Sequence, residues 1–541
     1  MKIWLYDTTL RDGAQAEGIS FSVRDKIEIA RQLDAMGVPF IEGGWPGANP
    51  KDVQFFWQLQ QEPLQQAEVV AFCATRRPHT QAKSDPMLAQ ILAAGTKWVT
   101  IFGKSWDLHV TDSLRTSLEE NLAAIDDSIR FLCSQGRSVI YDAEHWFDGY
   151  KHNPKYALQT LQAAIAAGAS WLVLCDTNGG TLPHEIAEIV TEIYRKIPNL
   201  NHPDYPKIGI HTHNDSGTAV ANAIAAVRSG ATMVQGTING YGERCGNADL
   251  CTLIPSLQLK LGMECLEEQN LAKLTATSRL VSEIANFAPE SRSPFVGRNA
   301  FTHKAGVHVS AIQKNPVTYE HICPEIVGNR RKIAISEQSG VSNVLHYAQK
   351  FGIELQKGDR FAKGILARLK DLENQGYQFE AAEASFELMM RLVMGQKPSF
   401  FELQGFQVHC NISPNFLSSP TSAVATIKVA VEGQNLLEVA EGNGAVSALD
   451  RALRKALSRF YPQIADFELT DYKVRILDGT KGTSAPIRVL VESSNGSQRW
   501  TTIGVSSNIL DASYQAVVEG IEYGLLHKEA MVSATLPTTT E

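Results

Sequence analysis

Residues 3–43 read IWLYDTTLRDGAQAEGISFSVRDKIEIARQLDAMGVPFIEG and contain one strand–helix–strand unit. The unit opens and closes with short apolar runs, 3–7 and 38–43, that are typical of buried strands. Between them, Ser22 with an Asp three residues later is a helix-capping signal, an apolar stripe of helical period follows, and Gly37 ends it. The stretch therefore predicts two parallel strands joined by a crossover helix.

The same alternation continues to about residue 265. Eight strand-like runs start 25 to 41 residues apart, at 3–7, 38–43, 68–74, 97–103, 138–144, 170–176, 207–213 and 232–238. Eight such units predict an α/β fold, a (β/α)8 TIM barrel that forms a catalytic domain over residues 1–265. A doubly wound open sheet is the alternative, but it would usually carry GxGxxG after its first strand, and this chain does not.

The rest of the chain predicts three further regions. Residues 266–395 lose the strand–helix rhythm and are expected to form helical accessory subdomains that pack on the barrel mouth. Residues 400–530 contain a weak repeat, TIKVAVE at 426–432 and PIRVLVE at 486–492, which predicts one α+β domain made of two strand–strand–helix copies. The polar tail, 531–541, is expected to be disordered.

Composition excludes several classes of protein. The 541 residues are 44% hydrophobic and 20% charged, a globular balance that rules out a disordered or fibrous chain. Fifty basic against 58 acidic residues give a net charge of -8, which favours no nucleic-acid partner. No apolar stretch approaches the roughly 20 residues of a membrane span, and Asp7 and Asp12 interrupt any signal peptide. Eight cysteines without a CxxC pair indicate reduced thiols and a cytoplasmic protein.

Polar residues collect where the predicted strands end, which is where barrel enzymes bind their substrates. Helix N-caps explain about half of them, but not the His and Glu residues. The candidates at the strand ends are Asp7, Arg11, Asp12, Glu42, Asp142, Glu144, Asp176, Thr177, Asn178, His211, His213, Asn214, Asp215 and Asn239.

His211 and His213 are two residues apart on a strand, so both side chains face the same side. A packed polar layer is one interpretation; a divalent-cation site with Asp12 as the third ligand is the favoured one. Two imidazoles and one carboxylate tolerate Zn, Mn, Fe or Mg, so the ligand types do not choose the metal. Arg11 suits an oxygen atom of a metal-bound ligand, and a surface salt bridge is its alternative.

Four motifs carry a family resemblance: DTTLRDG (7–13), CDTNGG (175–180), HTHNDSG (211–217) and NGYGERCGN (239–247). Together they resemble the DRE-TIM metallolyases, most densely the Claisen-condensing branch of isopropylmalate, homocitrate and citramalate synthases. The resemblance covers nearly the whole chain. The middle stretch resembles that branch's accessory subdomain, and the terminal repeat resembles its allosteric, dimerisation-type domain, which in relatives binds a branched-chain amino acid.

The resemblance implies a site and a homodimer. A divalent metal, Mn, Mg, Zn or Co, would be bound by Asp12, His211 and His213, with Asn247 as a further candidate. Catalytic and substrate-binding roles fall on Arg11, Asp142, Glu144 and Thr177, with acetyl-CoA as the second substrate. His308 and Tyr319 would assist from the partner subunit in a domain-swapped dimer.

Within the branch, the chain most resembles members that condense acetyl-CoA with pyruvate and water to give (R)-citramalate and CoA. The stretches that carry this resemblance are residues 11–26, 41–52 and 141–151. That reaction is an acyl transfer on the route to 2-ketobutyrate and isoleucine. Bulky Phe102 and Trp106 are expected to shrink the pocket around the methyl group of pyruvate. The alternatives are 2-isopropylmalate formation from 2-ketoisovalerate, an aldol-cleaving lyase, an amidohydrolase-type hydrolase, and an inactive amino-acid sensor. Isoleucine or leucine is the expected feedback ligand.

Overall fold

The computed structural model describes residues 1–200, 202–411 and 422–527. The chain forms two compact units: Met1–Phe301 with Ile322–Arg331, and Thr302–His321 with residues 332 onward. The predicted limits of the separate domains stay predictions, and the tail at 531–541 lies outside the described residues. Among the described residues, no helix is both long and apolar enough to cross a membrane.

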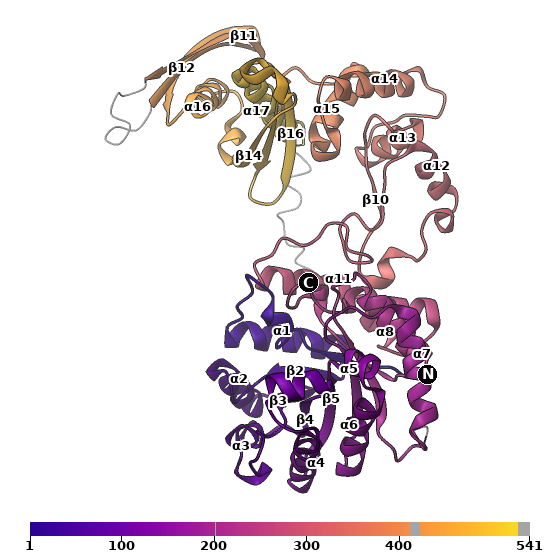
Figure 1. The fold of residues 1–541 in the computed structure, drawn as a ribbon. Coiled ribbons are helices and arrows are strands. Elements are labelled where there is room, and N and C mark those ends of the chain that lie inside the picture. Colours follow the sequence, from indigo (N-terminus) through magenta and orange to yellow (C-terminus); the bar gives the residue numbers. More distant parts are fainter. Residues whose placement is uncertain (201, 412–421, 528–541) are drawn as a thin grey trace, which may run out of the picture. The chain divides into compact units, whose positions relative to one another are not determined.

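Eight parallel strands close into a barrel in the first unit (Figure 1). Each strand pairs with the next, and β8 pairs with β1 to complete the ring. The predicted (β/α)8 barrel is therefore confirmed, and the open-sheet alternative is wrong. The strands are β1 (Trp4–Asp7), β2 (Phe40–Gly44), β3 (Glu68–Ala74), β4 (Trp98–Lys104), β5 (Ser138–Glu144), β6 (Trp171–Asp176), β7 (Lys207–Thr212) and β8 (Met233–Gly236).

Helices connect these strands, and the first begins and ends as its sequence predicts. Ser22 Oγ accepts a hydrogen bond from the Asp25 amide at 3.2 Å, and the Asp25 carboxylate accepts one from the Ser22 amide at 2.7 Å. Gly37 ends this helix with a φ of 87°, a left-handed conformation that glycine adopts without strain. The helices of the unit are α1 (Val23–Met36), α2 (Pro50–Gln61), α3 (Pro86–Ala93), α4 (Leu118–Ser134), α5 (Trp146–His152), α6 (Pro154–Ala167), α7 (Pro183–Lys196), α8 (Ala219–Arg228), α9 (Leu250–Pro255), α10 (Glu268–Leu271) and α11 (Leu274–Ile284).

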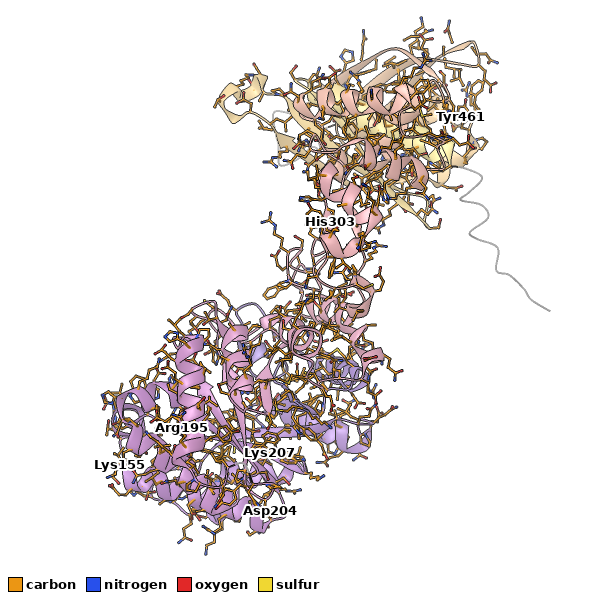
Figure 2. The ribbon with its side chains drawn as sticks, turned by 90° about the vertical axis from the view of Figure 1, so that its right-hand side faces the viewer. Lys155, Arg195, Asp204, Lys207, His303 and Tyr461 are labelled. Atoms are coloured by element: carbon orange, nitrogen blue, oxygen red, sulfur yellow. The ribbon has the colours of Figure 1, made fainter. Side chains whose placement is uncertain are left out.

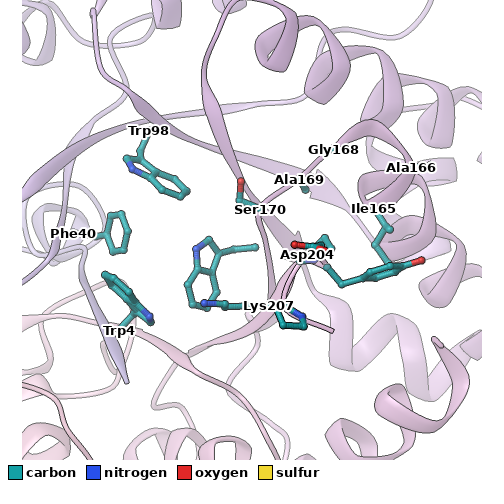
Figure 3. A pocket seen from close by; sticks show the side chains of 14 residues that line it. Trp4, Phe40, Trp98, Ile165, Ala166, Gly168, Ala169, Ser170, Asp204 and Lys207 are labelled. Atoms are coloured by element: carbon teal, nitrogen blue, oxygen red, sulfur yellow. The ribbon is translucent and has the colours of Figure 1, made fainter. Parts of the chain in front are cut away.

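Aromatic side chains close the amino-terminal end of the barrel around a pocket of about 730 Å³ (Figure 3). The Phe40 ring lies 5.8 Å from Trp4 and 5.2 Å from Trp98, centroid to centroid, and Trp171 lines the same pocket. The ammonium group of Lys207 lies 5.6 Å from the centre of the Trp171 ring. Packed aromatic rings fill much of this end, whereas the polar residues at the carboxyl ends of the strands lie at the opposite mouth.

The second unit contains two three-stranded antiparallel sheets, each followed by one helix. The repeated segments lie in the central strands β12 and β15, and residues of both sheets and both helices share one hydrophobic core. Tyr461, labelled in Figure 2, donates a 2.8 Å hydrogen bond to the Phe400 carbonyl just before the first sheet. The elements are β11 (Glu402–Asn411), β12 (Ser422–Val431), β13 (Gln434–Gly442), α16 (Ala445–Leu457), β14 (Glu468–Ile476), β15 (Ile487–Ser494), β16 (Arg499–Ser506) and α17 (Ile509–Leu526).

Each copy of the repeat has three strands, so the predicted strand–strand–helix pattern missed one strand per copy. The missed strands, β11 and β14, carry polar side chains at many positions, and most of β14 is exposed or half-buried. Before the sheets, the unit contains β9 (Thr302–His303), α12 (Gly306–Lys314), β10 (Lys332–Ile333), α13 (Val341–Lys350), α14 (Arg360–Asn374) and α15 (Glu383–Val393). That this accessory region packs on the barrel mouth stays a prediction.

Candidate active site

Three side chains with metal-binding atoms meet at the carboxyl end of the barrel strands. Asp12 follows β1, His211 lies in β7 and His213 directly follows that strand. The Nε2 atom of His211 lies 3.3 Å from the Asp12 carboxylate and 3.2 Å from the Nε2 atom of His213. The structure therefore brings together, within 4.8 Å of one another, ligand atoms of the three residues that the sequence singles out.

The electrostatics of this cluster favour a bound cation. Burial, together with the neighbouring His211, lowers the pKa of His213 to about 3, so its imidazole is neutral. Burial opposes ionisation of Asp12, but the charge of Arg11 and the His211 hydrogen bond outweigh it and hold the pKa of this carboxyl well below its usual range. Burial also acts to lower the pKa of His211, yet the Asp12 carboxylate raises it above the ordinary value. A divalent cation would displace the proton shared by Asp12 and His211.

Asn247 adds an amide oxygen beside the cluster. It forms an isolated β-bridge with His213, and its Nδ2 atom donates to the Tyr241 carbonyl at 3.1 Å. Its Oδ1 atom is buried and has no hydrogen-bond partner among the described residues. The backbone at position 242 can pack against the Asn247 side chain only because residue 242 is a glycine. A Cβ atom there would lie 2.4 Å from the Asn247 Nδ2 atom. An unpaired buried oxygen beside His213 fits a further ligand to a cation.

Arg11 is held by a fully buried carboxylate. Its Nε atom donates to Glu42 at 2.7 Å, and its guanidinium group lies 3.9 Å from the centre of the Phe72 ring. Glu42 also accepts hydrogen bonds from the hydroxyls of Tyr6 at 2.7 Å and Thr8 at 2.5 Å. Arg11 therefore forms a buried ion pair with Glu42, and the surface salt bridge that the sequence allowed as an alternative is not what the structure contains.

A pocket of about 230 Å³ opens onto these groups. Seven of the eight site residues predicted in the barrel line it, and the eighth, the candidate ligand Asn247, does not. The lining residues are Arg11, Asp12, Gln15, Trp45, Phe72, Phe102, Asp142, Glu144, Cys175, Thr177, His211, His213, Glu243 and Arg244.

An aromatic wall limits the size of the pocket. The rings of Phe72 and Phe102 stack at 5.2 Å, and the edge of Trp45 meets both, at 6.0 and 5.7 Å between centroids. The prediction that Phe102 lies at the pocket is confirmed, but the prediction for Trp106 is wrong. Trp106 packs 5.1 Å from His109, because the chain turns into an irregular helical segment after β4. Sequence reasoning gave Trp45 no role, although it directly follows β2.

The polar part of the pocket comes from β5 and the loop after β6. Glu144 forms an ion pair with Lys104, and the Thr177 hydroxyl accepts a 2.9 Å hydrogen bond from the His145 amide. Burial, with a contribution from Glu42, raises the pKa of Asp142 to about 7. These groups present both hydrogen-bond donors and acceptors to a small, oxygen-rich ligand.

Gln235 of β8 is a site residue that the sequence analysis missed. Its amide nitrogen donates to Asp142 at 3.1 Å, and its amide oxygen lies 2.8 Å from the Nδ1 atom of His211. The available signal was an amide side chain in the middle of the predicted strand at 232–238, where a buried polar group needs a hydrogen-bond partner.

His308 and Tyr319 lie in the second unit, where their rings are 4.2 Å apart between centroids. Tyr319 is 45% exposed, so its ring is available to another surface. The participation of this pair in catalysis stays a prediction.

Three family models match successive parts of the chain: HMGL-like over residues 2–281, homocitrate synthase post-HMGL domain-like over 295–377, and LeuA allosteric (dimerisation) domain over 380–525. The closed barrel and its Asp-His-His cluster therefore define an HMGL-like barrel enzyme with an appended LeuA-type domain.

Relatives along the full length narrow this class. An (R)-citramalate synthase of Synechocystis sp. is 69% identical over 525 residues, covering 97% of this chain and 96% of the relative. The (R)-citramalate synthase of Aquifex aeolicus is 50% identical and covers 98% of both chains. A 2-isopropylmalate synthase of Pelotomaculum thermopropionicum is 30% identical, covering 96% of this chain and 98% of the relative. The chain belongs to the (R)-citramalate synthase family, which confirms the predicted branch.

Proposed function

We propose that the barrel condenses acetyl-CoA with pyruvate and water to form (R)-citramalate and free CoA. The observation that carries this proposal is full-length identity of 45–69% to five relatives named (R)-citramalate synthase. The reaction joins the methyl carbon of the acetyl group to the ketone carbon of pyruvate. The methyl group loses one proton, the new alkoxide gains one, and water cleaves the thioester to release the CoA thiol.

Asp12, His211 and His213 would hold a divalent cation, and the Asn247 amide oxygen fits a fourth protein ligand. When bound, the cation supplies Lewis-acid polarisation of the ketone. Mn, Mg, Zn and Co remain candidates, because a mixed nitrogen and oxygen donor set accepts each of them. The low pKa values of Asp12 and His213 support ligand-competent protonation states at neutral pH.

Arg11 would stabilise negative charge as it develops on the ketone oxygen. Its buried pair with Glu42 supports this role, because a fixed donor needs no reorganisation during the reaction. Asp142, Glu144 and Thr177 would orient the keto acid. The wall formed by Trp45, Phe72 and Phe102 would accept the methyl group of pyruvate and exclude water.

The second unit would complete and regulate the enzyme. In a homodimer, His308 and Tyr319 of one subunit would assist the reaction in the other. The match to the LeuA allosteric domain supports feedback by a branched-chain amino acid, isoleucine or leucine, as expected for a committed step toward isoleucine in the cytoplasm.

The second candidate, 2-isopropylmalate synthesis, is favoured only by relatives at 30–31% identity. It needs room for the isopropyl group of 2-ketoisovalerate, and the aromatic wall restricts that room. An inactive sensor is disfavoured by the intact cluster of Asp12, His211 and His213.

Release of free CoA, followed with a thiol reagent, tests the proposal. Chelator-treated protein is restored with Mn²⁺, Mg²⁺, Zn²⁺ or Co²⁺ and given pyruvate, 2-ketobutyrate, 2-ketoisovalerate or 2-oxoglutarate, with and without isoleucine or leucine. We expect the highest kcat/KM with pyruvate and loss of activity on chelation. Asp12→Ala and His211→Ala should be inactive, whereas the exposed His184→Ala should match the wild type. Wild-type turnover in either ligand variant would contradict the metal assignment.

A further inference from the structure

Gln235 lies between a metal-binding histidine and a substrate-binding carboxylate. It is 1% exposed, and its amide group contacts His211 on one side and Asp142 on the other. Gln235 pairs with His211 in the register of β7 and β8, which places both side chains on the same face of the barrel wall. One side chain therefore touches both halves of the proposed site.

The chemistry of the amide fixes the direction of both hydrogen bonds. The Gln235 nitrogen donates to an oxygen atom of Asp142, which turns the Gln235 oxygen toward the Nδ1 atom of His211. That oxygen can only accept, so the Nδ1 atom of His211 must carry a proton. In a neutral imidazole the Nε2 atom then has a free lone pair. This atom is the one that lies 3.3 Å from the Asp12 carboxylate, among the ligand atoms of the cluster.

We propose that Gln235 is a positioning residue that holds His211 in the metal-binding tautomer and, by its other end, orients Asp142 toward the keto acid. The inference rests on the proposed function for the role of Asp142, but its metal-binding half does not require any activity. The planar amide presents an acceptor on one side and a donor on the other, which matches its two neighbours. Leu would leave both neighbours without their partner, and Glu would keep only the acceptor.

Two variants separate the two ends of the side chain. Gln235→Leu removes both hydrogen bonds, whereas Gln235→Glu preserves an acceptor for His211 and places a carboxylate against Asp142. The metal-binding test is calorimetric titration of Mn²⁺ into the chelator-treated full-length chain without substrates. The second test is KM for pyruvate at saturating Mn²⁺.

We expect Gln235→Leu to bind Mn²⁺ about 10- to 100-fold more weakly, the usual effect of losing a partner of a metal-binding histidine. Gln235→Glu should bind Mn²⁺ within about threefold of the wild type, because its acceptor remains. Its KM for pyruvate should nevertheless rise about tenfold, since two adjacent carboxyl groups compete for one proton and Asp142 loses the amide N–H that orients it. A merely structural role for Gln235 would not separate Mn²⁺ affinity from KM in this way.

Wild-type Mn²⁺ affinity in Gln235→Leu would overturn the inference, as would equal loss of affinity in both variants. If Gln235→Leu does not fold, Gln235→Glu alone still decides: retained affinity with raised KM supports the inference, and lost affinity overturns it. A wild-type chain that binds Mn²⁺ but does not consume pyruvate would contradict the proposed function and leave the His211 half of the inference standing.

Discussion

The buried ion pair between Arg11 and Glu42 can be tested with the substitution Glu42→Gln, which keeps the shape of the side chain and removes its charge. The carboxylate accepts hydrogen bonds from Arg11, Tyr6 and Thr8 at 2.7, 2.7 and 2.5 Å. An amide offers one acceptor oxygen where the carboxylate has two, and it turns an NH₂ group toward donors. In this variant the remaining ion-pair partner of Arg11 is Asp12, whose carboxylate lies 3.5 Å from the Arg11 Nη1 atom.

The expected cost follows from the burial of the pair. Removing one partner of a buried ion pair costs about 3–5 kcal/mol. Arg11 retains 14% side-chain exposure and Glu42 has none, so we expect the lower end, about 3 kcal/mol of unfolding free energy. If about half of this loss also reaches the transition state through a displaced guanidinium group, kcat/KM falls about tenfold.

Urea unfolding of the metal-free chain and the CoA-release assay measure the two effects. Thr8→Val is the matched control, because it removes one hydrogen bond to the same carboxylate and keeps the Arg11 pair. It should cost about 1–2 kcal/mol and leave kcat/KM nearly unchanged. Equal effects of the two substitutions, or a Glu42→Gln variant as stable and active as the wild type, would refute this account of how Arg11 is held.

Three further predictions concern the barrel. Burial raises the pKa of Asp7 to about 7, so the folded chain holds this proton more tightly than the unfolded one. The contribution of Asp7 to the unfolding free energy should therefore fall by about 4 kcal/mol as pH rises from 4 to 8, and Asp7→Asn should remove that part of the slope in urea titrations; an unchanged slope would contradict the assignment. Trp45→Ala should open the aromatic wall and raise the kcat/KM ratio of 2-ketoisovalerate to pyruvate about tenfold, whereas Trp57→Ala, which is 63% exposed, should not. An unchanged ratio in the first variant would remove Trp45 from substrate selection. Asn247→Ala should weaken Mn²⁺ binding in calorimetry about tenfold, and wild-type affinity would exclude its amide oxygen as a ligand.

The barrel could be predicted because its signals are local. Short apolar runs recur at the spacing of a strand and a helix, and the Ser22 cap and Gly37 end depend on neighbours a few residues away. The ligand cluster could also be predicted from the sequence, because the carboxyl ends of all barrel strands meet at the same mouth and this does not depend on the details of packing. This is why Asp12, His211 and His213 could be grouped from sequence.

The features that were missed depend on contacts across the barrel or on strands with a weak pattern. Gln235 and Asp142 are 93 residues apart in sequence, and only the closure of the sheet brings them together. Trp45 joins the wall through rings from two other strands. The strands β11 and β14 each contain a register shift, between Leu403 and Gly405 and between Leu469 and Asp471, which interrupts the alternation of apolar and polar residues.

The most direct test of the central claim is the substrate preference of the Mn²⁺-loaded chain, with the product identified by chiral chromatography. We predict (R)-citramalate from pyruvate, with kcat/KM at least about tenfold above that for 2-ketoisovalerate, and no product from Asp12→Ala. A higher kcat/KM with 2-ketoisovalerate, or citramalate formed equally well by Asp12→Ala, would contradict the account.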